Sequence, residues 1–199
     1  MSDPDVLVLR QTIHGLGPDE LAAAIRERLP DAEVARARTP AEERELIRSA
    51  RVAVGLNIEE ELLAAAEDLE LFACVFAGTG HLPRDLLADH GVAVTNASGV
   101  HGPNIAEHVV GSMIAHARQF HRAYRQQTRR EWRTYETTEI YGSTVAVVGL
   151  GAIGRAVVDR LASFDVETVG VRYSPEKGGP TDEVYGFDEF HEAVTDAEY

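Results

Sequence analysis

The residues whose types and spacing could do chemistry lie in the second half of the chain. An apolar run at 145–148 leads directly into Gly149-Leu-Gly151-Ala-Ile-Gly154, a G-x-G-x-x-G pattern, and a helix-forming segment at 155–163 follows at once. Strand, glycine turn and helix in this order are typical of a dinucleotide-binding βαβ unit. We therefore predict that the turn binds a dinucleotide through Gly149, Leu150, Gly151, Ala152, Ile153 and Gly154.

Each part of this turn has a separate task. Gly149 permits the tight turn, Gly151 lets the backbone approach a pyrophosphate, and Gly154 lets the helix pack closely on the strand. The N–H groups at Ala152 and Ile153 would face the phosphates, with the positive end of the helix dipole behind them. A second apolar strand at 166–171 strengthens this interpretation. The alternative is a doubly wound domain whose glycine turn holds no ligand.

The end of that second strand bears on which dinucleotide is bound. An acidic residue about 20 positions beyond the glycines would bind the ribose 2′-OH of NAD, whereas an arginine there accommodates the 2′-phosphate of NADP. This chain has Arg172 at that position, followed by Tyr173 and Ser174, and its only lysine, Lys177, lies in the same loop. The pattern favours NADP(H) over NAD(H). The alternatives are a solvated Lys177 and an Arg172 that stacks on the adenine of NAD.

The elements that must position these residues form an alternating pattern. Before residue 97, apolar strand-like runs alternate with helices of about ten residues, including helices at 39–49 and 58–69, which predicts a parallel sheet with helices on both faces. The stretch from Asn96 to Pro103 is rich in turn residues and is the expected hinge. From there we predict one long helix to about residue 124, with an apolar stripe formed by Ile105, Val109, Met113, Ala117, Phe120 and Tyr124.

Composition narrows the class of protein. The chain has 199 residues and a formal net charge of −14, with one lysine among its 19 basic residues. Such a negative field repels nucleic acid and anionic membranes, so we expect neither as a partner. Abundant carboxylates with almost no lysine indicate a salt-rich cytoplasm such as that of a halophilic archaeon, and codon bias in a GC-rich genome is the alternative. The single cysteine, Cys74, excludes an internal disulfide framework and is typical of a cytoplasmic protein.

Taken with the domain that precedes the glycine turn, the sequence resembles the D-isomer specific 2-hydroxyacid dehydrogenase family. The resemblance covers nearly the whole chain and rests on four ordered stretches, namely Ala77 to Leu82, Val94 to Ala97, Val100 to Val109 and Tyr141 to Arg155. It implies an α/β fold with parallel sheets, in which a flavodoxin-like substrate domain at 1–98 is followed by a Rossmann dinucleotide-binding domain at 99–199, incomplete at its C-terminus. It also implies a homodimer formed through the helix region 103–124, and burial in the domain's own core is the alternative for the apolar stripe there.

The resemblance further implies an oxidoreductase that transfers a hydride between NAD(P)H and a small 2-keto acid, giving the D-2-hydroxy acid. In the family, backbone N–H groups that follow a strand hold the substrate carboxylate, and they correspond here to Ala77, Gly78 and Thr79. A glycine-rich turn with unpaired donors is a suitable anion site. This chain departs from the family at Gly80, where Asp is common, and a plain strand-to-helix turn is the alternative.

The family's chemistry also requires an Arg that binds the keto acid, a His that serves as general acid and base, and a Glu that orients this His. In the family these follow later strands of the cofactor domain, so we expect no catalytic residue among these 199, an inactive fragment and a longer parent protein. Histidines 101, 108, 116 and 121 lack the spacing of a zinc site, and we predict no metal. The alternative function is a non-enzymatic dinucleotide sensor, similar to the family's co-repressor relatives.

Overall fold

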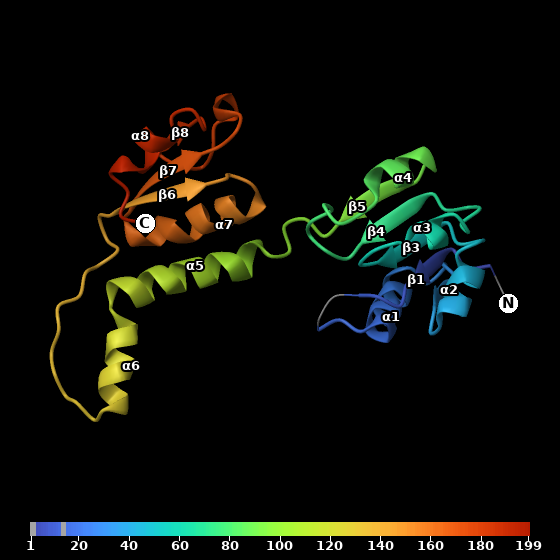
Figure 1. The fold of residues 1–199 in the computed structure, drawn as a ribbon, viewed down its shortest axis with the longest axis horizontal. Coiled ribbons are helices and arrows are strands. Elements are labelled where there is room, and N and C mark those ends of the chain that lie inside the picture. The colour runs from blue at the N-terminus through green and yellow to red at the C-terminus, as the bar shows by residue number, and fades with distance from the viewer. Residues whose placement is uncertain (1–2, 13–14) are drawn as a thin grey trace. The chain divides into compact units, whose positions relative to one another are not determined.

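The computed structural model describes residues 3–12 and 15–199. The chain divides into two compact units, Met1–Ser98 and Gly99–Tyr199. Both are built from parallel strands with helices packed on them (Figure 1), which confirms the expected α/β class. Within the described ranges, no helix has the length and apolar character that crossing a bilayer requires.

The first unit holds a five-stranded parallel sheet in the order β2-β1-β3-β4-β5, which is the flavodoxin-like doubly wound order. Its strands are β1 (Val6–Val8), β2 (Val34–Arg36), β3 (Val52–Gly55), β4 (Leu71–Cys74) and β5 (Ala93–Asn96). Its helices are α1 (Pro18–Arg28), α2 (Pro40–Leu46), α3 (Glu60–Leu63) and α4 (Arg84–Asp89). Because all strands run the same way, their carboxyl ends meet at one edge of the sheet.

Alternation along the strands explains why both faces of this sheet are covered. Leu7 and Phe72 are fully buried on one face, together with residues of α2, α3 and α4. Val6 and Val8 flank Leu7 in sequence and are buried on the opposite face, together with Ala22 of α1. Successive side chains of a strand point to opposite faces, so each of these short strands contributes to two apolar layers.

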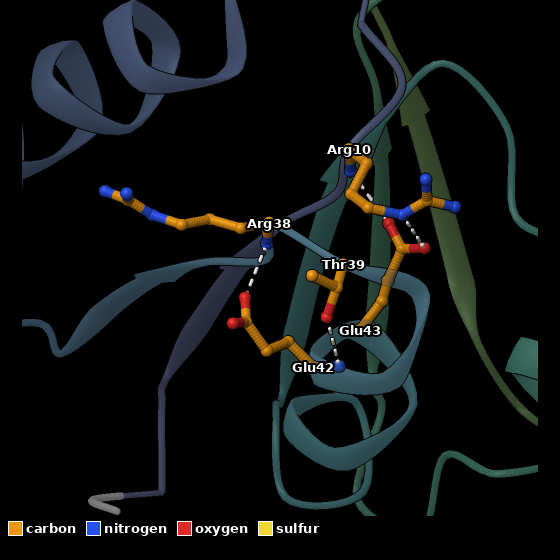
Figure 2. Close-up of polar contacts among 5 residues, drawn as sticks. All are labelled: Arg10, Arg38, Thr39, Glu42 and Glu43. Atoms are coloured by element: carbon orange, nitrogen blue, oxygen red, sulfur yellow. Dashed lines mark hydrogen bonds and ion pairs between the residues drawn. The ribbon is translucent and has the colours of Figure 1, made fainter.

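Helix α2 begins with two capping hydrogen bonds, shown in Figure 2. The Thr39 hydroxyl accepts a hydrogen bond from the Glu42 N–H at 3.2 Å, and the Glu42 carboxylate accepts one from the Arg38 N–H at 2.7 Å. The adjacent Glu43 is buried, and its carboxylate accepts from both the backbone N–H and the Nε of Arg10, at 2.7 and 2.9 Å. This pair fixes the start of α2 to the carboxyl end of β1.

The helix expected at 58–69 is much shorter in the structure, where α3 ends at Leu63. The reason is a competing set of backbone hydrogen bonds. The N–H groups of Glu67 and Glu70 donate to the carbonyls of Arg48 and Arg51, at 3.1 and 2.9 Å. These bonds draw the chain out of the helix and into β4.

The second unit contains a three-stranded parallel sheet in the order β6-β7-β8. Its strands are β6 (Thr144–Val148), β7 (Glu167–Val171) and β8 (Glu183–Tyr185), and its helices are α5 (Gly102–Ala117), α6 (Phe120–Thr128), α7 (Ala152–Leu161) and α8 (Phe190–Thr195), with short 3-10 turns at Ala162–Phe164 and Pro175–Lys177. Helices α5 and α7 pack closely, since a Cβ added to Gly102 would lie 3.4 Å from the Cβ of Ala156. Apolar residues of α5, α7 and β6 form one core cluster.

The prediction of a single long helix at 103–124 is wrong, because the structure has two helices there, α5 and α6. Gln119 adopts a left-handed conformation, with φ of 49°. Its side chain amide donates to the Glu136 carbonyl at 2.8 Å, and the Thr138 N–H donates to the Ala117 carbonyl at 3.0 Å. The segment at 136–138 therefore takes over hydrogen bonds at the end of α5. The apolar stripe predicted for 103–124 is divided at Gln119. Met113 and Ala117 are buried in the core.

The last two residues lie on the edge of β6 that faces away from β7. The Glu198 N–H donates to the Thr144 carbonyl at 3.0 Å, and the Ala146 N–H donates to the Tyr199 carbonyl at 2.9 Å. The backbone groups of Ser143 and Gly149, which flank β6, bond to β7 instead. The three strands keep the order β6-β7-β8, and the last two residues bond to the other side of β6.

Thr168 and Asp182 join β7 to the segment that leads into β8. The Asp182 carboxylate accepts from the backbone N–H and the hydroxyl of the buried Thr168, both at 2.8 Å. These two donors hold the pKa of Asp182 below its ordinary value of 3.8. The stability that they contribute is therefore present above the unfolded-state pKa and is lost as the pH falls through the lower folded-state pKa.

We expect Thr168→Val to lower the free energy of unfolding by roughly 0.5–1.5 kcal/mol at neutral pH, because it removes one of the two donors. The difference from the wild type should shrink as the pH falls below about 4. Thermal unfolding followed by circular dichroism across this range measures both effects. Thr168→Ser retains the hydroxyl and is the control. Equal, pH-independent losses in both variants would show that Thr168 contributes by packing alone.

Candidate functional site

The glycine turn follows β6 directly and is shaped by backbone geometry. Gly149 has φ of +96°, a conformation that residues with side chains rarely adopt, and its N–H donates to the Val171 carbonyl at 2.7 Å. Gly151 is the N-cap of α7. The turn is therefore anchored to the end of β7 before the helix begins.

Gly154 allows the closest approach between helix and strand. A Cβ built on this residue would lie 2.0 Å from the carbonyl oxygen of Gly149 and 3.3 Å from Val147 Cγ1. No side chain fits in that space. Gly151, by contrast, has no atom within 4 Å of an added Cβ. A residue with a side chain at 151 would consequently disturb a ligand above the turn rather than the turn itself.

The start of α7 offers free donors to an anion. The Arg155 N–H donates to the Gly151 carbonyl at 3.0 Å, so the N–H groups of Ala152 and Ile153 precede the first bond of the helix. Ala152 and Ile153 are exposed, and the side chain of Leu150 between the glycines is buried. A groove of about 680 Å³ beside β6 is lined by Val148, Gly149, Ile153, Gly154 and Tyr199, among others. The groove therefore reaches the glycine turn and the first turn of α7.

Arg172 lies at the same edge of the sheet as the glycine turn. It follows Val171, the residue whose carbonyl holds Gly149, and its own N–H donates to the Tyr185 carbonyl at 3.0 Å. Tyr173 is 90% exposed, Ser174 is half-buried and Lys177 is exposed in the 3-10 turn. The structure thus brings the end of β7 and the glycine turn side by side, with Lys177 five residues farther along the loop.

The guanidinium of Arg172 also has a structural partner. Its Nη1 donates a hydrogen bond to the carbonyl of Gly178, at the end of the 3-10 turn. This bond folds the loop back over the arginine, and the side chain is half-buried as a result. A guanidinium carries five N–H donors, so one bond to the loop leaves others for a ligand.

In the first unit, the turn after β4 carries the residues expected to hold a carboxylate. Gly78 is exposed, whereas Ala77 and Thr79 are half-buried. The carbonyls of Ala77 and Thr79 accept hydrogen bonds, from Asn96 Nδ2 at 2.6 Å and from the Leu82 N–H at 3.1 Å. Among the described residues, the N–H groups of Ala77, Gly78 and Thr79 donate to no protein acceptor. They remain available to an anion.

Two residues that hold this turn were not singled out from the sequence. Asn96, at the end of β5, is one, and His81 is the other, because its Nε2 lies 2.7 Å from the Leu56 carbonyl and its ring stacks edge-on against Phe76. The position of Asn96 at the carboxyl end of β5, the strand next to β4, could have indicated that it lies near this turn. His81 had no such signal, since its partner lies 25 residues earlier in the sequence.

Histidines 101, 108 and 116 lie on or next to α5, and His121 lies in α6. Within the described ranges, no group of three or more His, Cys, Asp or Glu side chains is placed to share a metal ion. Beside His108, Glu107 lies 3.8 Å from Arg160 and links α5 to α7. Cys74 is buried, with its sulfur 3.6 Å from the Leu56 carbonyl. Glu107 and Cys74 thus make contacts within the fold of their units.

Comparison with known proteins agrees with this geometry. Residues 110–199 match the family described as D-isomer specific 2-hydroxyacid dehydrogenase, NAD binding domain. The D-3-phosphoglycerate dehydrogenase of Methanocaldococcus jannaschii is 32% identical over 161 residues, which is 78% of this chain and 30% of that protein. The glyoxylate reductase of Thermofilum pendens is 33% identical over 117 residues, or 56% of this chain and 34% of that protein.

A solved structure supports the same relationship. A D-isomer specific 2-hydroxyacid dehydrogenase family protein from Aeromonas salmonicida superposes with a TM-score of 0.77 at 25% identity, covering 99% of this chain and 62% of that one. The protein is therefore an α/β protein with a dinucleotide-binding unit. It belongs to the D-isomer specific 2-hydroxyacid dehydrogenase family. The chain spans about a third of the length of the curated relatives it matches.

Two glycine substitutions should separate folding from binding. We expect Gly154→Ala to lower the free energy of unfolding by about 3 kcal/mol or more, because its Cβ would overlap a backbone oxygen. Gly151→Ala should change stability by less than about 1 kcal/mol but weaken dinucleotide binding at least about tenfold. Thermal unfolding and titration with NADH and NADPH give the two readouts.

Gly111→Ala is the matched control for these variants. Gly111 is exposed on α5 with open space around an added Cβ, so alanine should stabilise the helix slightly and leave binding unchanged. Undiminished dinucleotide binding by Gly151→Ala would contradict the assignment of this turn to the pyrophosphate.

Proposed function

We propose that this chain supplies the substrate domain, residues 1–98, and the dinucleotide-binding domain, residues 99–199, of an NAD(P)-dependent D-2-hydroxyacid dehydrogenase. The enzyme would transfer a hydride between NAD(P)H and a small 2-keto acid or the corresponding D-2-hydroxy acid. The observation that carries the proposal is the close glycine turn between the carboxyl end of β6 and the start of α7. None of the relatives named above is a regulatory protein, so the co-repressor-like alternative has no comparable support.

Each unit has a defined task in this proposal. In the dinucleotide-binding unit, the N–H groups of Ala152 and Ile153 bind the pyrophosphate, and Gly149, Gly151 and Gly154 admit it. When bound, the nicotinamide ring supplies or accepts the hydride. In the substrate unit, the free N–H groups of residues 77–79 bind the carboxylate of the keto acid and orient its carbonyl. Asn96 and His81 act as positioning residues, because they hold the turn that presents these donors.

We further propose that these 199 residues bind the cofactor without turning over substrate. The arginine, histidine and glutamate that the family uses on the carbonyl correspond to no residue of this sequence. We expect the purified chain to bind NADPH in molar KCl and to leave it unoxidised with glyoxylate, pyruvate, hydroxypyruvate and 2-ketoglutarate. Absorbance of the reduced nicotinamide measures this directly. Oxidation with any of these acids would mean that acid–base residues lie within the chain.

For the cofactor, we propose NADP(H) rather than NAD(H). Arg172 stands where an acidic residue would bind the ribose 2′-OH, and its guanidinium has donors beyond the one given to Gly178. Ser174 and Lys177 add a hydroxyl and a second positive charge to the same loop. Tyr173, almost fully exposed, presents a ring beside them.

Arg172→Gln should raise the Kd for NADPH roughly tenfold to a hundredfold, because a hydrogen bond to a charged phosphate is lost. The Kd for NADH should change by less than about threefold, since NADH has no 2′-phosphate. Lys177→Gln is the comparison variant and should have the smaller effect. Fluorescence titration with NADPH and with NADH measures both Kd values. Equal losses for both cofactors would mean that Arg172 only holds the loop, and tighter binding of NADH by the wild type would refute the NADP assignment.

The proposed enzyme is a cytoplasmic homodimer in a salt-rich cell. The single cysteine and the net charge of −14 favour that location, and neither nucleic acid nor membrane is a proposed partner. We place the dimer contact in the helix region 103–124. Phe120 and Tyr124 are its exposed apolar residues, at 42% and 66% of their surface, whereas Met113 and Ala117 are buried within the unit.

A further inference from the structure

Arg155 follows Gly154 directly and contacts the glycine turn with both its backbone and its side chain. Its backbone N–H donates to the Gly151 carbonyl at 3.0 Å, and its side-chain Nε donates to the Leu150 carbonyl at 3.1 Å. The side chain therefore runs back along α7 toward the start of the helix, the direction that long helical side chains favour. Although Arg155 is an exposed residue, its guanidinium thus lies against the backbone of the turn.

The surroundings of Arg155 in the sequence carry no other charge. It is the only charged residue between Glu139 and Asp159, a stretch that contains β6, the glycine turn and the start of α7. The six residues of the turn, 149–154, are glycine, leucine, alanine and isoleucine and have no polar side chain. Within this stretch a ligand phosphate can therefore meet one charged side chain, and its charge is positive.

The guanidinium of Arg155 has donors that the fold does not use. A guanidinium carries five N–H donors, and the Leu150 carbonyl accepts from one of them, on Nε. In the part of the chain that the structure describes, Nη1 and Nη2 donate to no protein acceptor and lie within ion-pair distance of no carboxylate. Arg160, the other arginine of α7, lies 3.8 Å from Glu107 and 4.0 Å from Asp159. The charge of Arg155 is thus left uncompensated among the described residues.

We propose that Arg155 binds the pyrophosphate of the dinucleotide through Nη1 and Nη2. The Nε bond to Leu150 stays in place, and the two outer nitrogens donate to phosphate oxygens, as guanidinium groups commonly do in pairs. They add a positive charge to the neutral N–H groups of Ala152 and Ile153 at the same phosphates. This inference rests on the proposed function and adds to it a binding residue outside the G-x-G-x-x-G pattern.

Two physical effects favour this role for Arg155. A chain with a net charge of −14 repels the anionic phosphates of a dinucleotide, and a positive charge next to the turn offsets that repulsion locally. The bond to the Leu150 carbonyl also restrains the guanidinium before the ligand arrives, so that binding removes less side-chain entropy.

The 2′-phosphate of NADP is the other phosphate that a cation at this edge of the sheet could bind. Its proposed partner, Arg172, shares a loop with Lys177, whereas Arg155 bonds to the turn over which the pyrophosphate would lie. The two positions are close enough to need a test, because the Leu150 side chain fills the space above Gly179 of that loop. NADPH contains both phosphate groups and NADH only the pyrophosphate, so a comparison of the two separates the assignments.

The test measures the Kd of NADPH, NADH and adenosine diphosphate ribose for the complete chain by titration. All three ligands contain the pyrophosphate. We expect Arg155→Gln to raise each Kd roughly tenfold to a hundredfold, because a hydrogen bond between charged groups is lost. Arg155→Lys keeps the charge without the fork of donors and should give Kd values between those of the wild type and Arg155→Gln.

Arg160→Gln is the matched control. It removes the same charge from the same helix, at a residue that already has carboxylate partners. Its Kd values should stay within about twofold of the wild type, because its charge lies farther along the helix and is screened by salt. Circular dichroism should show the same secondary structure and similar melting temperatures in all variants.

Unchanged Kd values in Arg155→Gln overturn the inference and leave the proposed function standing. A loss confined to NADPH also overturns it, since Arg155 would then act at the 2′-phosphate. So does an equal loss in Arg155→Lys and Arg155→Gln, which would mean that Arg155 only holds the turn. A wild type that binds none of the three ligands contradicts the proposed function and this inference with it.

Discussion

The contact on which the second unit depends is the approach of α7 to β6 at Gly154. Because a Cβ there would lie only 2.0 Å from the Gly149 carbonyl, the helix begins directly against the strand that it follows. The same turn directs the side chain of Leu150 into the core. There it fills the space above Gly170 of β7 and Gly179 of the following loop, where added Cβ atoms would lie 2.7 and 2.4 Å from it. One tight turn therefore sets the position of α7, β7 and the loop that carries Lys177.

The sequence predicted the parts of the fold that are decided locally. The alternation of strands and helices, the glycine turn and the start of α2 near Thr39 all depend on residues within a few positions of one another. The break at Gln119 and the early end of α3 depend instead on backbone groups that lie 17 to 21 residues away, at Glu136, Thr138, Arg48 and Arg51. Such hydrogen bonds override helical periodicity, and no pattern within the helix itself announces them.

The features of the candidate site also divide into those that the sequence predicted and those that it could not predict. The glycines and the N–H groups of α7 follow from the motif, and residues 77–79 follow from the family resemblance. The second partner of Arg172 could not be predicted, because the carbonyl of Gly178 reaches it only after the loop has folded into a 3-10 turn. That bond is compatible with a phosphate ligand. By restraining the guanidinium before any ligand arrives, it reduces the side-chain entropy that binding would otherwise remove.

The charge of the protein constrains how its copies can associate. Each copy carries a formal net charge of −14, so two copies repel each other at low ionic strength. Molar salt reduces the screening length to about 3 Å and removes most of this repulsion. Contacts that survive such screening are those within a few ångströms, together with apolar burial, which excluded salts strengthen. In the proposed contact region 103–124, Phe120 and Tyr124 are exposed apolar side chains. Association of two copies through this region would therefore become stronger as the salt concentration rises.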